Sequence, residues 1–395
     1  QSSRTPMDAP PAKGRTPAGG PRLRVGFIGP GLGGHGQVRQ GLAGTGSGGE
    51  SAAAFLGPLL EAGDERLEFA WYMTRPREDA VSDRLRERTV IWRNVAHGGD
   101  ADVASVIGAD GVDVLIDIGG YADGARPGVL ARRAAPLQVA WPGWPVPTGS
   151  ATGEIDARLG DGATDPAVAG NTGALGRVLR LDPCAWCWSP AWAGATDASV
   201  RGATGASGRA EARADGVTFA CVAPLERVTG EALRVWARLL RRVRASRLLL
   251  ACAGLADPRT RADVLARLAA QGVERERVEV AGDGPAGALA HADVLLDTFP
   301  FNDPAGACAA LHAGVPVVTL AGEPGLPHAR ATLSVLRSAS RSGVLETLAA
   351  HEDAQEYLEI AEALADDAPA RAELRRTLRP TMLASALCDA GAYAT

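Results

Sequence analysis

The sequence predicts an α/β protein built as two successive lobes, each containing a parallel sheet. Short apolar segments rich in β-branched residues recur along the chain, and stretches rich in Ala, Leu and Arg separate them. Strands that alternate with helices form parallel sheets that are covered on both faces. Because two such series follow one another, we expect two Rossmann-like lobes with an interlobe cleft and a helical C-terminal tail.

The first series of strands begins at Leu23. The intervening stretches have helical character, including 124–133. The expected strands cover 23–28, 67–73, 112–118 and 137–141.

The second series begins at residue 217. Its first helix is expected at 230–243, where Leu233, Trp236, Leu239 and Leu240 recur at helical spacing. Two further helices are expected at 257–271 and 305–313. The expected strands cover 217–222, 246–252, 277–282, 293–298 and 315–320.

Composition shifts place the boundaries between these parts. A Pro-, Gly- and Ala-rich opening predicts disorder, and a drift to Gly, Ala, Thr, Ser and Arg predicts a linker. The expected parts are a disordered tail (1–21), an N-terminal lobe (22–192), a linker (193–214), a C-terminal lobe (215–350) and a helical tail (351–395).

Charge and hydropathy restrict the classes of partner. The 395 residues carry a net charge of −5, whereas proteins that bind nucleic acid generally are basic. No apolar run reaches the length of a membrane span, so we expect neither a nucleic-acid nor a membrane partner. Lys13 is the only lysine, so arginine must supply any cationic chemistry in the folded body. This Arg bias is typical of a GC-rich, bacterial genome.

The six cysteines predict a reduced, cytoplasmic protein with buried thiols. Cys184 and Cys187 form a C-x-x-C pair, for which zinc or redox chemistry is the alternative. No second pair follows at zinc-ribbon spacing, and Pro and Trp flank the first pair.

A glycine-rich loop follows the first strand. Gly29, Gly31 and Gly34 fit G-x-G-x-x-G, the dinucleotide fingerprint, which makes an NAD(P)-dependent oxidoreductase one hypothesis. The second strand, however, ends in Thr74 and Arg75 instead of the acidic residue that binds the ribose.

Two segments, 113–149 and 293–322, carry the most specific pattern. Each joins a strand to a Gly/Pro-rich loop, the arrangement that forms ligand sites at the carboxyl ends of parallel strands. Together they resemble the catalytic region of the O-GlcNAc transferase (SPINDLY-like) family of glycosyltransferases. In the first segment, the matching residues are Gly120, Tyr121, Gly124, Arg126, Arg132, Arg133, Ala135, Pro136, Gln138, Trp141, Gly143, Pro145, Thr148 and Gly149. Asp156, Asp161, Asp165 and Pro166 continue the match.

The resemblance implies a GT-B fold with a nucleotide-sugar-binding C-terminal lobe. It implies transfer of a sugar, N-acetylglucosamine from UDP-GlcNAc, to a protein Ser/Thr hydroxyl, with inversion and without a metal or other cofactor. The partners implied are the nucleotide-sugar donor and a protein or peptide acceptor. His35 and Arg227 would be catalytic. The implied donor-binding residues are Gly33, Gly34, Pro142, Gly143, Phe301, Asn302, Pro304, Ala305, Gly306 and Ala307.

Several polar side chains of the family are replaced in this chain. Arg227 stands in place of a lysine, and Ala223 and Pro224 stand where relatives have amide side chains. Residues 304–307 (Pro, Ala, Gly, Ala) replace histidine and threonines, although backbone N–H groups at a helix start can bind phosphate unaided. A second hypothesis is therefore a degenerate family member that binds or scaffolds without turnover.

Overall fold

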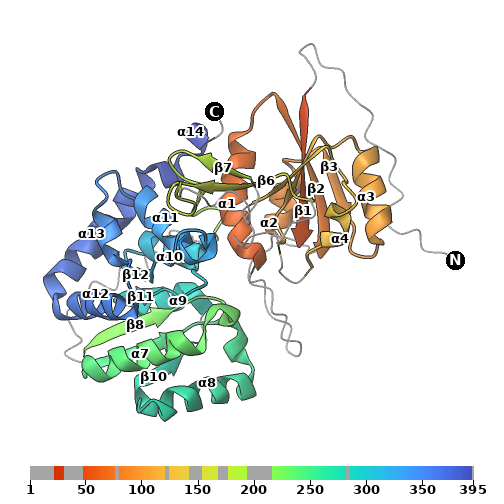
Figure 1. Cartoon of the computed structure of the whole chain (residues 1–395). Coiled ribbons are helices and arrows are strands. Elements are labelled where there is room, and N and C mark those ends of the chain that lie inside the picture. The colour runs from red at the N-terminus through yellow and green to blue at the C-terminus, as the bar shows by residue number, and fades with distance from the viewer. Residues whose placement is uncertain are drawn as a thin grey trace. The chain divides into compact units, whose positions relative to one another are not determined.

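The computed structural model describes residues 22–30, 48–75, 80–120, 124–141, 154–167, 177–193, 216–281 and 284–393 (Figure 1). These residues form two compact units. The first unit contains the described residues up to 192 together with 390–393, and the second contains those from 193 to 389.

The first unit is a seven-stranded, fully parallel sheet in the order β3-β2-β1-β4-β5-β6-β7. Its strands are β1 (Leu23–Pro30), β2 (Leu67–Arg75), β3 (Ile91–Asn94), β4 (Val114–Asp117), β5 (Leu137–Ala140), β6 (Ala157–Asp161) and β7 (Val178–Leu181). Its helices are α1 (Gly48–Ala62), α2 (Ala80–Arg86), α3 (Asp100–Ala109), α4 (Pro127–Leu130) and α14 (Ala390–Tyr393).

Alternate residues of the central strands cover the two faces of this sheet. Phe27 and Trp71 lie on one face, their rings 5.0 Å apart, in a cluster with Leu56 of α1. Ile28 and Tyr72, the next residues, lie in a second cluster with Val103 and Ile107 of α3. Helices therefore bury both faces, as expected for a parallel sheet.

The second unit is a six-stranded parallel sheet in the order β10-β9-β8-β11-β12-β13. Its strands are β8 (Val217–Cys221), β9 (Ser246–Leu250), β10 (Val278–Val280), β11 (Val294–Leu296), β12 (Val317–Leu320) and β13 (Ala349–Ala350). Its helices are α7 (Gly230–Arg242), α8 (Pro258–Ala270), α9 (Gly284–His291), α10 (Pro304–His312), α11 (Ala331–Ser338), α12 (Ala354–Asp366) and α13 (Ala368–Leu383).

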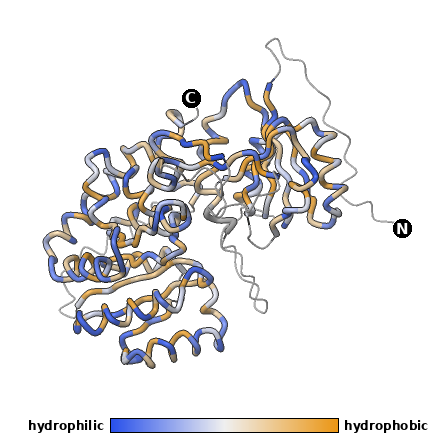
Figure 2. Tube along the Cα trace, in the orientation of Figure 1, coloured by the Kyte–Doolittle hydropathy of each residue, from blue (hydrophilic) through white to orange (hydrophobic). Residues whose placement is uncertain are grey.

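Helix α7 shows why these segments are helical. Thr229 caps its start by accepting a hydrogen bond from the Ala232 N–H at 3.1 Å. Leu233, Trp236 and Leu240 are buried, while the arginines of the opposite face are exposed or half-exposed, and Figure 2 shows the same division along the trace.

Both sheets reverse strand order at an equivalent place. The reversal lies between β1 and β4 in the first unit and between β8 and β11 in the second. Ligands of doubly wound folds bind outside the carboxyl ends of the strands at such a switch point. The expected fold class, two Rossmann-like α/β lobes, is confirmed.

One helix prediction was wrong in extent. The helix expected at 124–133 is only α4, because Pro127 starts it and Arg133 takes a left-handed φ of 52°. The tail expected at 351–395 contains α12 and α13, which belong to the second unit, and α14, which belongs to the first. The predictions for residues 1–21 and 194–214 lie outside the described residues.

Within the described residues, no helix is both long and apolar enough to cross a membrane.

Candidate functional site

Arg227 lies just beyond the carboxyl end of β8, at the switch point of the second unit. It ends a short 3₁₀ helix, Leu225–Arg227, which follows the strand after three residues. Its guanidinium donates to the carbonyl of Asn302, and its Nη1 lies 3.8 Å from the Asp303 carboxylate. The expected catalytic cation is therefore bound to the loop after β11.

That loop, residues 297–303, brings the other predicted residues to the same place. The ring of Phe301 stacks on the imidazole of His328, with centroids 5.0 Å apart. The side chain of Asn302 is buried, and its amide donates to the carbonyl of Thr298 at 3.0 Å. The side chain of Asn302 thus positions the loop.

Helix α10 begins directly after the loop with Pro304, Ala305, Gly306 and Ala307. Pro304 has no N–H, and the N–H of Ala307 donates to the carbonyl of Asp303 at 3.0 Å, as the first helical hydrogen bond. Only the N–H groups of Ala305 and Gly306 therefore remain for an anion. The N–H of Ala307, one of the residues expected to bind the donor, therefore closes the first turn.

Two carboxylates lie beside this helix start. Asp297 follows β11 and accepts hydrogen bonds from the Asp303 N–H at 2.8 Å and the Thr319 hydroxyl at 2.7 Å. Burial raises the pKa of Asp297 to about 6, against the effect of these bonds. Burial also raises the pKa of Asp303, while Arg227 opposes that rise.

The first unit has an equivalent acid. Asp117 ends β4, beside the first unit's switch point, and its Oδ1 accepts from the N–H groups of Gly119 and Gly120 at 3.0 and 3.3 Å. Burial raises the pKa of Asp117 to about 6. Sequence reasoning missed the roles of Asp117 and Asp297. The available signal was a carboxylate placed directly after an apolar strand.

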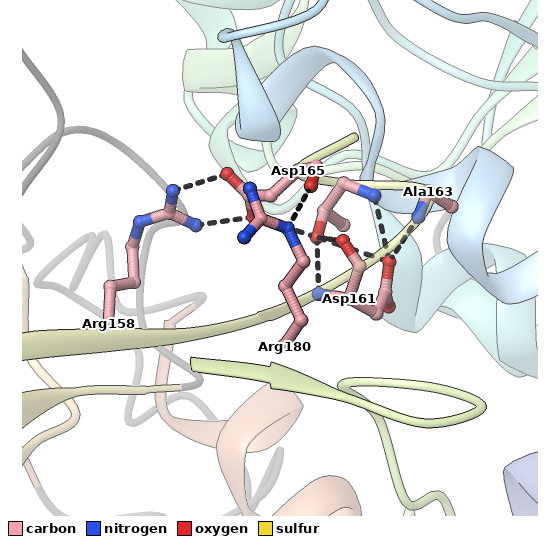
Figure 3. Close-up of polar contacts among 6 residues, drawn as sticks. Arg158, Asp161, Ala163, Asp165 and Arg180 are labelled. Atoms are coloured by element: carbon pink, nitrogen blue, oxygen red, sulfur yellow. Dashed lines mark hydrogen bonds and ion pairs between the residues drawn. The ribbon is translucent and has the colours of Figure 1, made fainter. Parts of the chain in front are cut away.

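Asp161 and Asp165, which continue the family pattern beyond residue 150, lie in a buried polar network (Figure 3). Arg158 of β6 binds the Asp165 carboxylate through two hydrogen bonds of 2.8 and 2.5 Å. Asp161 accepts from the N–H groups of Ala163 at 2.8 Å and Ala185 at 2.9 Å. The network holds the turn after β6 and the segment around Ala185, so its role is structural.

The remaining predicted site residues are not described. His35, Gly33, Gly34, Pro142 and Gly143 lie outside the described residues. Across the part of the chain that the structure describes, no group of three or more His, Cys, Asp and Glu side chains could hold a metal ion. Cys184 and Cys187 are buried, and the zinc interpretation gains no support.

The geometry can be compared with known proteins. The profile of glycosyl transferase family 41 matches residues 86–171 and 205–395. A probable UDP-N-acetylglucosamine–peptide N-acetylglucosaminyltransferase SPINDLY of Eustoma exaltatum subsp. russellianum is 33% identical over 84% of this chain and 35% of its own length. Its namesake in Arabidopsis thaliana is 29% identical over 85% of this chain and 36% of its own length. The chain thus spans about a third of the length of these curated relatives.

Two solved structures are also similar. A lysine-to-methionine mutant of the O-GlcNAc transferase of Thermobaculum terrenum is 29% identical, with a TM-score of 0.72 over 100% of this chain and 68% of that one. A glycosyltransferase of Rickettsia africae is 8% identical, with a TM-score of 0.53 over 94% of this chain and 96% of that one, and shows the fold alone. These findings leave the oxidoreductase hypothesis without support. The chain belongs to glycosyl transferase family 41 and has a GT-B fold.

Proposed function

We propose that this chain is the catalytic region of a glycosyltransferase that transfers N-acetylglucosamine from UDP-GlcNAc to a Ser or Thr hydroxyl of a protein. The observation that carries the proposal is the position of Arg227 beside the start of α10, at the switch point of a sheet in this family. A cation and helix N–H groups at such a place suit a nucleotide diphosphate.

The proposed reaction is a single displacement. The acceptor hydroxyl attacks the anomeric carbon, its proton is lost to a base, and the bond from that carbon to the diphosphate oxygen breaks with inversion. Arg227 would stabilise the negative charge that develops on the leaving diphosphate. We propose that no metal or cofactor is needed, because Arg227 and the N–H groups of Ala305 and Gly306 provide this stabilisation.

The other proposed site residues rest on the family resemblance. His35 would position the acceptor or carry its proton, and Gly33, Gly34, Pro142 and Gly143 would contact the donor. Phe301 contributes an aromatic ring beside the helix start.

Substitution of Arg227 tests the proposal. Removing a charge-assisted contact to phosphate costs about 1.5–3 kcal/mol, so Arg227→Ala should weaken UDP binding about 10- to 150-fold in calorimetric titration. Arg227→Lys keeps the charge, so its affinity for UDP should lie between those of the wild type and Arg227→Ala. Arg267→Ala is the matched control, since Arg267 lies on α8 and is 60% exposed. Unchanged UDP affinity in Arg227→Ala would remove this residue from the donor site.

One observation favours a second candidate, a binding protein without turnover. The side chains of Ala223, Ala305 and Ala307 are apolar, and an acidic residue, Asp303, lies beside the two available N–H groups. Such a protein would bind UDP-GlcNAc without releasing UDP in the presence of acceptor peptides. Measured UDP release that depends on Arg227 would exclude it.

We also propose that the protein works in the cytoplasm of a bacterium. Five of its six cysteines are buried, which supports a reducing compartment, and the arginine bias supports a GC-rich genome. Cell fractionation of the source organism would test the location.

A further inference from the structure

Asp303 lies where an anion would approach helix α10. It is the residue just before the helix, and its side chain is only 9% exposed. A Cβ atom added at Gly306 would overlap Asp303 Oδ2, so this carboxylate oxygen lies against the first turn. The N–H groups of Ala305 and Gly306 act on the same carboxylate and lower its pKa, although it makes no capping hydrogen bond of ordinary geometry.

This carboxylate therefore lies beside the two N–H groups that remain for a ligand. The helix dipole favours one negative charge at its start, and Asp303 already supplies it. A diphosphate at the same place would bring further negative charge close to Asp303. The carboxylate and the ligand would compete for the same two donors.

The charged neighbours do not offset this competition. Arg227 is the cation that acts on Asp303, at 3.8 Å. Glu226, next to Arg227, is a second acid that acts on it from the same 3₁₀ helix. Asp297 accepts the Asp303 N–H at 2.8 Å, and the thiol of Cys221 lies on the side of β8. Asp303 thus has one guanidinium and two further carboxylates as neighbours.

We propose that Asp303 is an internal anion that competes with the donor diphosphate at the start of α10, so that donor binding requires Asp303 to take up one proton from solvent. The proposal rests on the proposed function, because it assumes that the donor diphosphate binds here. Burial already raises the pKa of Asp303, which brings protonation closer to neutral pH. Asp303 thereby helps to determine donor affinity at a site where several polar side chains of the family are replaced.

The sign of the pH effect follows from proton linkage. If the complex holds one proton more than the free protein, affinity falls as pH rises above the pKa of Asp303 in the free protein. The fall reaches at most about tenfold per pH unit. Asp303→Asn cannot ionise, so its donor affinity should be independent of pH in this range and exceed that of the wild type at pH 8. Asn is also a good residue before a helix, which favours folding of the variant.

The experiment is calorimetric titration of the full chain with UDP-GlcNAc, whose diphosphate keeps a constant charge between about pH 6 and pH 8. Titrations in buffers of different ionisation enthalpy count the protons taken up. We expect uptake of up to one proton by the wild type, none by Asp303→Asn, and at least about fivefold tighter binding by this variant at pH 8. Asp263→Asn is the control, since Asp263 lies on α8 and is 60% exposed; it should match the wild type.

Two results would overturn the inference. One is an Asp303→Asn variant that binds no more tightly than the wild type at pH 8. The other is proton uptake that persists in this variant, which would assign the proton to another group such as Asp297. Loss of thermal stability identifies a variant that fails to fold, and Asp303→Ser, which also suits a helix start, then takes its place.

Thermal stabilisation by sulfate distinguishes a failure of this inference from a failure of the proposed function. If no form of the protein binds UDP-GlcNAc, the donor assignment fails, and thermal stabilisation by sulfate still measures anion binding at α10. Greater stabilisation of Asp303→Asn than of the wild type and Asp263→Asn would support the internal anion. Equal stabilisation of all three would refute it.

Discussion

Arg158→Met tests whether the buried network of the first unit is held by one ion pair. The side chains of Arg158 and Asp165 are 5% and 3% exposed, and two hydrogen bonds join them. Methionine approximates the length of the arginine stem but leaves the Asp165 carboxylate without its cation. Breaking a buried pair in this way costs about 3–5 kcal/mol.

The lower end of this range is the better estimate for Arg158→Met. The hydroxyl of Thr164 still donates to Asp165 Oδ2 at 2.9 Å in the variant, which partly satisfies the carboxylate. We therefore expect a loss of about 3 kcal/mol, which shifts the unfolding equilibrium more than 100-fold. A double variant, Arg158→Met with Asp165→Leu, should recover part of this loss, because it removes the unpaired charge as well.

Urea unfolding followed by tryptophan fluorescence measures this loss of stability in the first unit. The described tryptophans of the first unit are 71, 92, 141, 186, 188 and 192, whereas Trp236 is the one in the second. Arg376→Met is the control, because Arg376 pairs with Glu373 at the surface and such pairs contribute about 0–1 kcal/mol. A loss within 1 kcal/mol of that control would refute the reasoning that the pair holds the network.

Two further predictions concern the first unit. Because burial raises the pKa of Asp117 from 3.8 to about 6, folding favours its neutral form, and wild-type stability should fall as pH rises from about 4 to 6. Asp117→Asn should lack this fall, which amounts to about 3 kcal/mol; parallel pH profiles of unfolding for the two proteins would contradict the assignment. Tyr393→Phe should lose about 1 kcal/mol in the same urea assay, because the Tyr393 hydroxyl donates to the carbonyl of Ala185 at 2.8 Å. An unchanged urea midpoint would mean that α14 is held by the packing of the Tyr393 ring against Trp141 and not by this hydrogen bond.

The regular elements were predictable where one physical signal was strong. The helix expected at 230–243 is found as Gly230–Arg242, because an apolar stripe and the Thr229 cap agree. β6 was not identified, since its charged residues, Arg158 and Asp161, interrupt the apolar pattern and are buried through partners outside the strand, such as Asp165 and the N–H of Ala185. An isolated strand pattern cannot reveal such partners. The shortness of α4 was missed for a related reason: Arg133, which has a left-handed φ, bonds to Asp156, 23 residues further along the chain.

The candidate site was predictable in position and less so in chemistry. Arg227 and residues 301–307 could be placed at strand ends, because the order of elements fixes the switch point. The partner of Arg227, Asp303, follows only from the folded loop, which turns both residues toward each other. The sequence alone also could not decide which N–H groups of α10 remain available.

Acidic residues lie at the switch points of both units. They bear on how the proposed donor site binds its ligand with few polar side chains. Asp117 ends β4 and Asp297 follows β11, the strands next to the two reversals, and burial raises the pKa of each to about 6. In both places the carboxylate accepts backbone N–H groups of the following loop, so it fixes the loop rather than offering itself to a ligand. By fixing the loop after β11, Asp297 positions both the start of α10 and the carbonyl of Asn302. This carbonyl accepts a hydrogen bond from Arg227. We propose that a site built this way would recognise a diphosphate through backbone geometry and one cation, with an affinity set by the charge state of the neighbouring Asp303.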